Sequence, residues 1–134
     1  MAHDETQTRG HAQRLATARR IRREVLGDAH IQQSAADGDP LMRPKTEMSE
    51  YVWAHIWSRP GLSRKTRSVI NLALLTAMNR PEELRLHING ALNNGLEAEE
   101  IMEVLLQCGT YCGIAAAKDS FAIMAEVFEA RGIE

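Results

Sequence analysis

The sequence predicts an all-α fold of about six helices, in a single domain that covers residues 1–134. Apolar residues recur every three or four positions through most of the chain, which places them on one face of a helix. No segment shows the alternation of apolar and polar residues that is typical of a half-buried strand. A chain of 134 residues is also long enough for one hydrophobic core and too short for two.

The first predicted helix runs from about Thr6 or Thr8 to Leu26, and a glycine follows it. Its apolar side chains are spaced by three, three and four residues, which favours one buried stripe along the helix. Residues 28–44 are rich in turn-forming residues and are interpreted as a connector, with one short helical turn over 31–36.

Two helices are predicted in the middle of the chain. The first covers 46–58, with Thr46 as its N-cap, and the sequence SRPG ends it. Ser63 then caps a helix that continues to about Met78. Because the stretch SVINLALLTAM is apolar nearly all round, this helix is predicted to be the central and most buried one.

Three further helices are predicted toward the C-terminus. The stretch RPEELRLHINGALNNG forms the fourth helix, with Pro81 tolerated in its first turn and Gly95 able to adopt a left-handed cap. The fifth begins near residues 97–98, and Gly109 and Gly113 allow neighbouring backbones to approach it closely. The sequence AAAKDSFAIMAEVFEARG forms the sixth.

Composition excludes several classes of partner. The net charge of -2 gives no bulk attraction to nucleic acid or to an anionic membrane. No apolar run approaches the roughly 18–20 residues of a membrane span, and the polar N-terminus is not a secretory signal, so a cytoplasmic location is expected. Two cysteines do not form a disulfide framework, and five histidines in no clustered spacing predict no metal site.

Glu83 and His87 are the first candidates for chemistry. They stand four residues apart, so their side chains lie on one face of the fourth helix. A carboxylate beside an imidazole fixes its tautomer and suits it to proton donation near neutral pH. An ordinary surface pair on an amphipathic helix has the same spacing, and spacing does not separate the two interpretations.

Three other features suggest either binding or packing. Arg67 lies near the start of a helix, where its charge and the helix dipole together favour an anion such as a carboxylate. Trp53 and Trp57 lie one helical turn apart, and so do Cys108 and Cys112. The tryptophan pair is interpreted either as core packing or as a pocket wall. The cysteine pair is interpreted either as core packing or as a site that meets a thiol-reactive substrate or binds metal.

The blocks WSRPGL, TRS and ELRLH, followed by EEIMEVLLQCGTYCGI, resemble the gamma-carboxymuconolactone decarboxylase family of the alkylhydroperoxidase-like superfamily. The resemblance implies an alkylhydroperoxidase-like helical fold and a homo-oligomer, commonly a hexamer with sites near the subunit interfaces. It also implies a small-molecule lactone carboxylate as substrate. The reaction expected is decarboxylation of 4-carboxymuconolactone to beta-ketoadipate enol-lactone in protocatechuate catabolism, with no cofactor.

Redox relatives in that superfamily carry Cys-x-x-Cys-x-x-x-His. Laid on His87, this pattern would need cysteines at Arg80 and Glu83, so the resemblance points to the decarboxylases. A thiol-dependent peroxidase or reductase that uses the two cysteines remains an alternative, as does a non-catalytic protein that binds small molecules. Ala115 stands where the decarboxylases usually carry a proline, which leaves the exact substrate open.

Loss of carbon dioxide from such a lactone leaves electrons that delocalise onto the lactone oxygen. The enzyme must therefore stabilise an oxyanion, protonate carbon and hold the remaining carboxylate. The resemblance gives His87 the role of general acid or oxyanion partner, with Glu83 orienting it. The substrate-binding residues that it implies are Arg67 for the carboxylate, with Trp57, Tyr111 and Cys112 as pocket walls.

Overall fold

The structure is a computed structural model that describes residues 2–33 and 39–134. Every regular element of the described residues is helical, which confirms the predicted all-α fold. The chain forms two compact units, Met1–Gly61 (unit 1) and Leu62–Glu134 (unit 2). The single domain expected over residues 1–134 stays a prediction, because two compact units can belong to one domain or to two.

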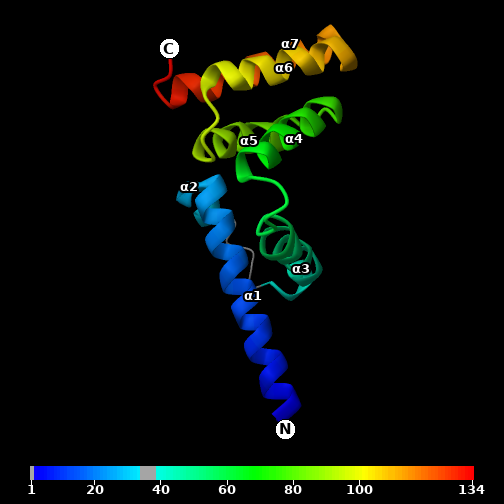
Figure 1. Ribbon diagram of the computed structural model, residues 1–134, viewed down its shortest axis with the longest axis vertical. Helices are drawn as coiled ribbons and strands as arrows, with labels where there is room; N and C mark the ends of the chain where they lie inside the picture. Colours follow the sequence, from blue (N-terminus) through cyan, green and yellow to red (C-terminus); the bar gives the residue numbers. More distant parts are fainter. Residues whose placement is uncertain (1, 34–38) are drawn as a thin grey trace. The chain divides into compact units, whose positions relative to one another are not determined.

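Unit 1 is built around one long helix (Figure 1). Its elements are α1 (Ala2–Leu26), α2 (Asp28–Gln33), the 3-10 turn η2 (Pro40–Met42), α3 (Arg43–Glu50) and the π-helical segment η3 (Tyr51–Ile56). Ile21 and Val25 of α1 are buried against Trp53 and Trp57. The two indole rings stack, with their centroids 5.2 Å apart, and so form the centre of a small apolar core.

The second predicted helix was wrong at its start. The chain is already helical at Arg43, and Thr46 lies inside α3, where its hydroxyl donates to the carbonyl of Met42 (3.2 Å) instead of capping the helix. The Asp39 carboxylate accepts the backbone N–H of Leu41 (2.9 Å) and so begins the preceding turn η2. The helical path therefore starts earlier than the apolar pattern indicates.

The connector predicted over 28–44 is also partly helical. The short turn predicted over 31–36 belongs to α2, which begins three residues earlier, and residues 34–36 lie outside the described part of the chain. At the other end of α3 the Trp57 N–H donates to the Val52 carbonyl (3.0 Å), five residues back, which is the π-helical spacing. Sequence periodicity alone did not indicate this widened turn.

Unit 2 consists of two antiparallel helical hairpins (Figure 1). They contain α4 (Arg64–Ala77), α5 (Pro81–Asn93), α6 (Ala98–Cys112) and α7 (Ile114–Ala130). These four helices confirm the predicted third to sixth helices to within a few residues. Ser63 caps α4 by accepting the Thr66 N–H (3.0 Å), and Gly95 follows α5 with a φ of 92°, both as predicted.

The prediction that the third helix is the most buried was wrong. α4 packs against α5, α6 and α7, and buries Leu72 among them. On its other side Ile70 and Leu74 are 41% and 52% exposed. Three neighbouring helices cover only part of the circumference of α4, so its second apolar face stays open in a single copy of the chain. The largest buried cluster is spread over the four helices instead.

The turn between α6 and α7 depends on two glycines. Gly113 has a φ of 104°, a conformation that residues with a side chain rarely adopt. A Cβ atom on Gly109 would lie 2.7 Å from the Cβ of Ala117, so only glycine allows the two helices to approach this closely. The expected close approach is confirmed at Gly109, whereas a Cβ atom on Gly113 would meet nothing within 4 Å, so Gly113 is needed for its backbone conformation instead.

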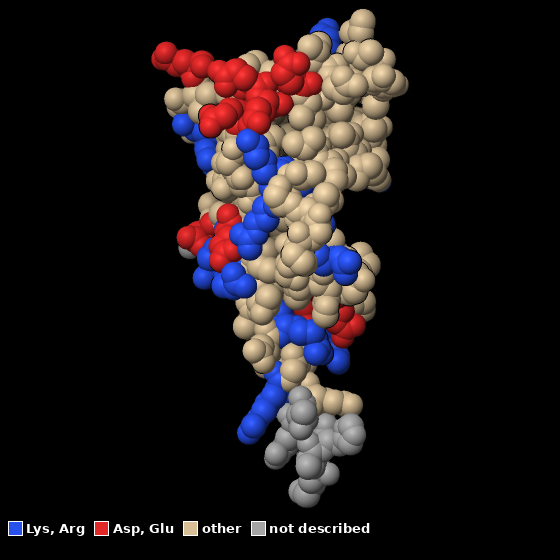
Figure 2. Space-filling model, viewed as in Figure 1, with Lys and Arg blue, Asp and Glu red and all other residues tan. Residues whose placement is uncertain are grey.

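Charge is unevenly distributed over unit 2. Figure 2 shows acidic side chains gathered where α6 begins and where the chain ends, while the opposite end of unit 2 is mostly uncharged in this view. That opposite end contains the α6–α7 turn, where Leu106, Tyr111 and Ile114 are 58%, 81% and 83% exposed. In the described residues, no helix is both long and apolar enough to cross a membrane.

Candidate active site

His87 lies in the middle of α5, half-buried between the buried residues Leu84 and Ile88. Its ring nitrogen Nδ1 lies 3.4 Å from the amide nitrogen Nδ2 of Asn71, which belongs to α4. One side of the imidazole is thus held by the neighbouring helix, and the ring is still accessible at the surface of unit 2. A held, accessible imidazole is the arrangement that proton transfer or oxyanion binding requires.

The contact between His87 and Asn71 is fixed by the packing of α4 on α5. A turn of three residues joins the two helices, so they run antiparallel. Near the far end of α5 the Asn94 amide donates to the hydroxyl of Ser68 (2.9 Å), and Ser68 is completely buried. This bond helps to fix the register of the two helices, and in that register Asn71 lies opposite His87.

Arg67 lies one turn before Asn71 on α4, so the two side chains share a face of that helix. Its Nε atom is fully buried, and the residue as a whole is half-buried. Lys65, also in the first turn, forms an ion pair with Glu100 of α6 (2.9 Å). Arg67 thus combines a cation with partial burial near the N-terminus of α4, on the side that carries Asn71, and Arg64, one turn earlier, is half-buried as well.

Glu83 lies in the first turn of α5, one turn before His87, and its side chain is exposed. A carboxylate at this position interacts favourably with the helix dipole, whether or not it also contacts the imidazole. The role of orienting His87 therefore stays a prediction for Glu83. The hydrogen-bonding distance given for His87 joins it to Asn71.

The three predicted pocket-wall residues lie in different places. Trp57 is 5% exposed in the core of unit 1, whereas Arg67, Asn71 and His87 belong to unit 2. Tyr111 and Cys112 are exposed at the end of α6. At a rise of 1.5 Å per residue, Tyr111 lies about 16 Å along this helix from Glu100, the residue that pairs with Lys65 of α4. Their roles in binding substrate stay predictions.

The two cysteines differ in exposure. Cys108 is buried, and burial raises the pKa of its thiol, with a smaller contribution from Cys112. A raised pKa keeps the Cys108 thiol protonated and a poor nucleophile. Cys112 is exposed. The environment of Cys108 thus favours its interpretation as a packing residue.

Asn71 is the site residue that sequence reasoning missed. It is the one amide within the apolar run SVINLALLTAM. A polar side chain that is covered by a neighbouring helix needs a hydrogen-bonding partner, so an amide in an apolar run could have indicated a specific contact at this position. The sequence did not indicate the partner, because His87 lies 16 positions away.

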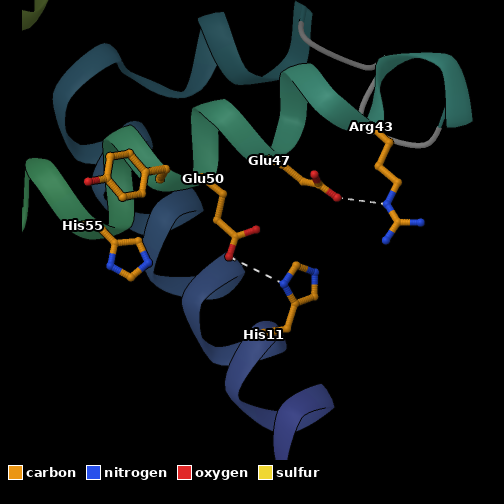
Figure 3. Close-up of a pocket in the computed structure, with 6 residues that line it drawn as sticks. His11, Arg43, Glu47, Glu50 and His55 are labelled. Atoms are coloured by element: carbon orange, nitrogen blue, oxygen red, sulfur yellow. Dashed lines mark hydrogen bonds and ion pairs between the residues drawn. The ribbon is translucent and has the colours of Figure 1, made fainter. Parts of the chain in front are cut away.

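A second polar cluster lies in unit 1, around a hollow of about 370 Å³ (Figure 3). Its lining residues come from α1, α3 and η3, and they are His11, Arg43, Glu47, Glu50, Tyr51 and His55. Arg43 and Glu47 form an ion pair at 3.0 Å along α3. The Tyr51 and His55 rings stack with their centroids 5.3 Å apart. The sequence analysis did not predict this cluster.

Glu50 is the buried member of that cluster, with 9% of its side chain exposed. Its Oε1 atom lies 3.6 Å from His11 Nδ1 and 3.7 Å from Arg14 Nε, both on α1. These distances allow ionic attraction but exceed those of a good hydrogen bond. The contacts join α3 to α1, so they act on the packing of unit 1.

Comparison with known proteins places these observations in a family. Residues 45–126 match the model of the Carboxymuconolactone decarboxylase family. The chain is 36% identical over 122 residues to a 4-carboxymuconolactone decarboxylase of Acinetobacter baylyi, covering 90% of this chain and 91% of that protein. It is 33% identical over 124 residues to a nitrosuccinic acid decarboxylase of Metarhizium robertsii, covering 92% and 87%.

The family match covers η3 and α4 to α6 completely, together with most of α3 and α7. It therefore contains Asn71 and His87, which the α4–α5 hairpin brings together, and Arg67, which lies one turn before Asn71 on α4. Both relatives are similar to this chain over nearly its whole length, beyond the matched region. The chain therefore belongs to the carboxymuconolactone decarboxylase family.

Proposed function

We propose that the protein is a carboxy-lyase that converts 4-carboxymuconolactone to beta-ketoadipate enol-lactone, without a cofactor, in protocatechuate catabolism. The observation that carries the proposal is the half-buried imidazole of His87, held by Asn71 of α4, in a chain of this family. The cationic Arg67 lies one helical turn before Asn71. The 36% identity to a protein named for this reaction supports the choice of substrate.

The reaction begins with cleavage of the bond between the ring carbon and its carboxylate. Carbon dioxide leaves, and the electron pair moves through the ring onto the lactone carbonyl oxygen. In the proposed site the Arg67 guanidinium binds the carboxylate that remains on the substrate. His87 faces the oxygen that gains charge, as general acid or oxyanion partner. A proton then adds to the ring carbon next to the carbonyl.

The other predicted residues keep their proposed roles. Glu83, one turn before His87 on α5, assists in orienting the imidazole. Trp57, Tyr111 and Cys112 form walls of the pocket. A less polar environment at the departing carboxylate would favour its loss as neutral gas, and such side chains supply that environment.

The proposal includes a cytoplasmic homo-oligomer, a hexamer as the family resemblance implies. Its support within the chain is the apolar surface that a single copy leaves open. Ile70 and Leu74 of α4 are exposed, and so are Leu106, Tyr111 and Ile114 near the α6–α7 turn. Exposed apolar side chains in this number favour contact with further protein.

A nitrosuccinate is a second candidate substrate, because the chain is 33% identical to a decarboxylase named for it. The chemistry makes the same demands. Loss of carbon dioxide from the carbon that bears the nitro group moves the electron pair onto the nitro oxygens. A second carboxylate remains for Arg67, and His87 would face the nitro oxygens.

The test is the ratio of kcat/KM for 4-carboxymuconolactone to kcat/KM for nitrosuccinate, measured with the purified full chain by carbon dioxide release. The proposal predicts a higher value for the lactone. A higher value for nitrosuccinate would mean that the protein is a decarboxylase whose preferred substrate is nitrosuccinate. Saturable binding of both compounds without carbon dioxide release would refute the enzyme and favour a binding protein.

A further inference from the structure

We propose that Asn71 is a positioning residue that holds His87 as the neutral tautomer with its proton on Nε2. The catalytic consequence rests on the proposed function, whereas the tautomer itself does not. The assignment begins with the two atoms that face each other, Nδ2 of Asn71 and Nδ1 of His87, at 3.4 Å. An amide nitrogen donates hydrogen bonds and accepts none, so the ring nitrogen opposite it must be the acceptor.

An accepting Nδ1 fixes the state of the ring. Its lone pair points to Asn71, and the single proton of the neutral imidazole is therefore on Nε2. The doubly protonated ring would direct an N–H at the amide N–H of Asn71, and two donors facing each other repel. Asn71 thus disfavours the charged form of His87 as well as the other neutral tautomer.

The packing of the hairpin keeps this amide in place. Asn71 lies on α4 next to the fully buried Leu72, and the Asn94–Ser68 bond at 2.9 Å ties the same two helices together. Both partners of the contact belong to the α4–α5 hairpin of the chain itself. His87 is therefore set in one tautomer before the substrate arrives, which is the condition for an effective oxyanion partner.

The tautomer decides between the two roles proposed for His87. A neutral imidazole that gave its Nε2 proton to carbon would become an imidazolate, which is a very unfavourable anion. The same N–H can instead donate a hydrogen bond to the lactone oxygen as that oxygen gains charge. His87 is then the oxyanion partner, and the proton that reaches the ring carbon comes from solvent water.

The first experiment is ¹⁵N NMR of the full chain labelled in its five histidines. The signals of His87 are assigned by their loss in His87→Gln. The proposal predicts a protonated Nε2 and an unprotonated Nδ1 near neutral pH, and a smaller fraction of this tautomer in Asn71→Leu. A protonated Nδ1 in the wild-type protein, or the same tautomer fraction in Asn71→Leu, would overturn it.

The second experiment is steady-state kinetics of Asn71→Asp with 4-carboxymuconolactone. A carboxylate accepts hydrogen bonds, so it draws the proton to Nδ1 and removes it from Nε2. We expect kcat to fall about 10- to 100-fold, the range in which losing an orienting partner affects metal-bound imidazoles, with little change in KM. The matched control is Asn89→Asp on α5. The Asn89 amide donates to the Arg85 carbonyl, so we expect this variant to keep the wild-type kcat.

The two experiments separate the inference from the proposed function. If the wild-type protein has the predicted tautomer but releases no carbon dioxide, the tautomer stands and the decarboxylase is refuted. If the protein decarboxylates the lactone and Asn71→Asp keeps the full kcat, the decarboxylase stands and the positioning role is refuted. Circular dichroism of each variant shows whether a loss of activity reflects unfolding.

Discussion

His87 and His11 present the same ring nitrogen to different partners in the two units. In unit 2 the Nδ1 of His87 faces the amide of Asn71 at 3.4 Å, and in unit 1 the Nδ1 of His11 faces the carboxylate of Glu50 at 3.6 Å. An amide nitrogen that faces Nδ1 favours the tautomer with its proton on Nε2, whereas a carboxylate forms an ion pair with an imidazole that carries a second proton. The partner therefore determines what each histidine is suited to do.

The surroundings strengthen the contrast. His87 is half-buried on a helix that packs against the helix of Arg67, so a cation suited to a substrate carboxylate lies on the neighbouring element. His11 is 55% exposed, and it shares Glu50 with Arg14 from its own helix. We therefore propose that the reaction takes place at His87 and that His11 joins α1 to α3.

The largest effect is expected from removing each imidazole in turn. His87→Ala should reduce turnover of 4-carboxymuconolactone by at least ~10²-fold, because it removes the group that faces the developing charge. His11→Ala should leave turnover within about two-fold of wild type, because His11 contacts Glu50 in unit 1. A two-fold change in rate corresponds to ~0.4 kcal/mol of activation free energy. Carbon dioxide release measures both. Equal losses in the two variants would remove the distinction between the two histidines.

The next effect concerns Arg67, the cation one helical turn before Asn71 on α4. Arg67→Leu should raise KM for the lactone about 10- to 100-fold, because a charged hydrogen bond to a carboxylate contributes about 1.5–3 kcal/mol. Lys65→Ala, in the same helical turn, is the control, since Lys65 is paired with Glu100. The two KM values measure the result. An unchanged KM in Arg67→Leu would mean that the substrate carboxylate binds elsewhere.

A smaller expected difference separates the two thiols, and it tests whether sulfur competes with His87 for the chemistry. Iodoacetamide at pH 8 should modify the exposed Cys112 well before Cys108, because burial raises the pKa of the Cys108 thiol and hides it. Mass spectrometry of the digested protein gives the order of modification. Faster modification of Cys108 would indicate an activated thiol and would revive the thiol-dependent alternative.

The smallest effect extends the comparison to a third imidazole. His30 lies 3.5 Å from a guanidinium nitrogen of Arg22, and burial, followed by the charge of Arg22, lowers its pKa from the usual 6.5. Because the unfolded chain binds this proton more readily, the folded state loses stability as pH falls through the usual histidine range. Thermal unfolding at several pH values should show a weaker acid dependence in His30→Asn than in wild type. An identical dependence would contradict the shift.

How much of the fold could be predicted depended on local signals. The helices of unit 2 were predicted closely because residues such as Ser63, Pro81 and Gly95 mark their ends within the sequence itself. The start of α3 was missed because it follows from the turn that Asp39 caps, several residues earlier. The exposure of Ile70 and Leu74 was missed because hydrophobicity alone does not say how many neighbours a helix has.

The site shows the same limit. His87 and Arg67 were predicted from residue type, helix position and family resemblance, and the structure brings their helices together. Asn71 was missed although it is an amide in an apolar run, because its meaning depends on a partner 16 positions away. The pairing of Glu50 with His11 was missed for the same reason. Contacts between distant residues follow from packing and are not visible in spacing.

The most direct test of the central claim is carbon dioxide release from 4-carboxymuconolactone by the purified chain, with no metal and no thiol added. We expect one molecule of carbon dioxide for each lactone consumed, with beta-ketoadipate enol-lactone as the product and a rate that requires His87. Failure to release carbon dioxide from the lactone, or release that depends on added thiol, would contradict it.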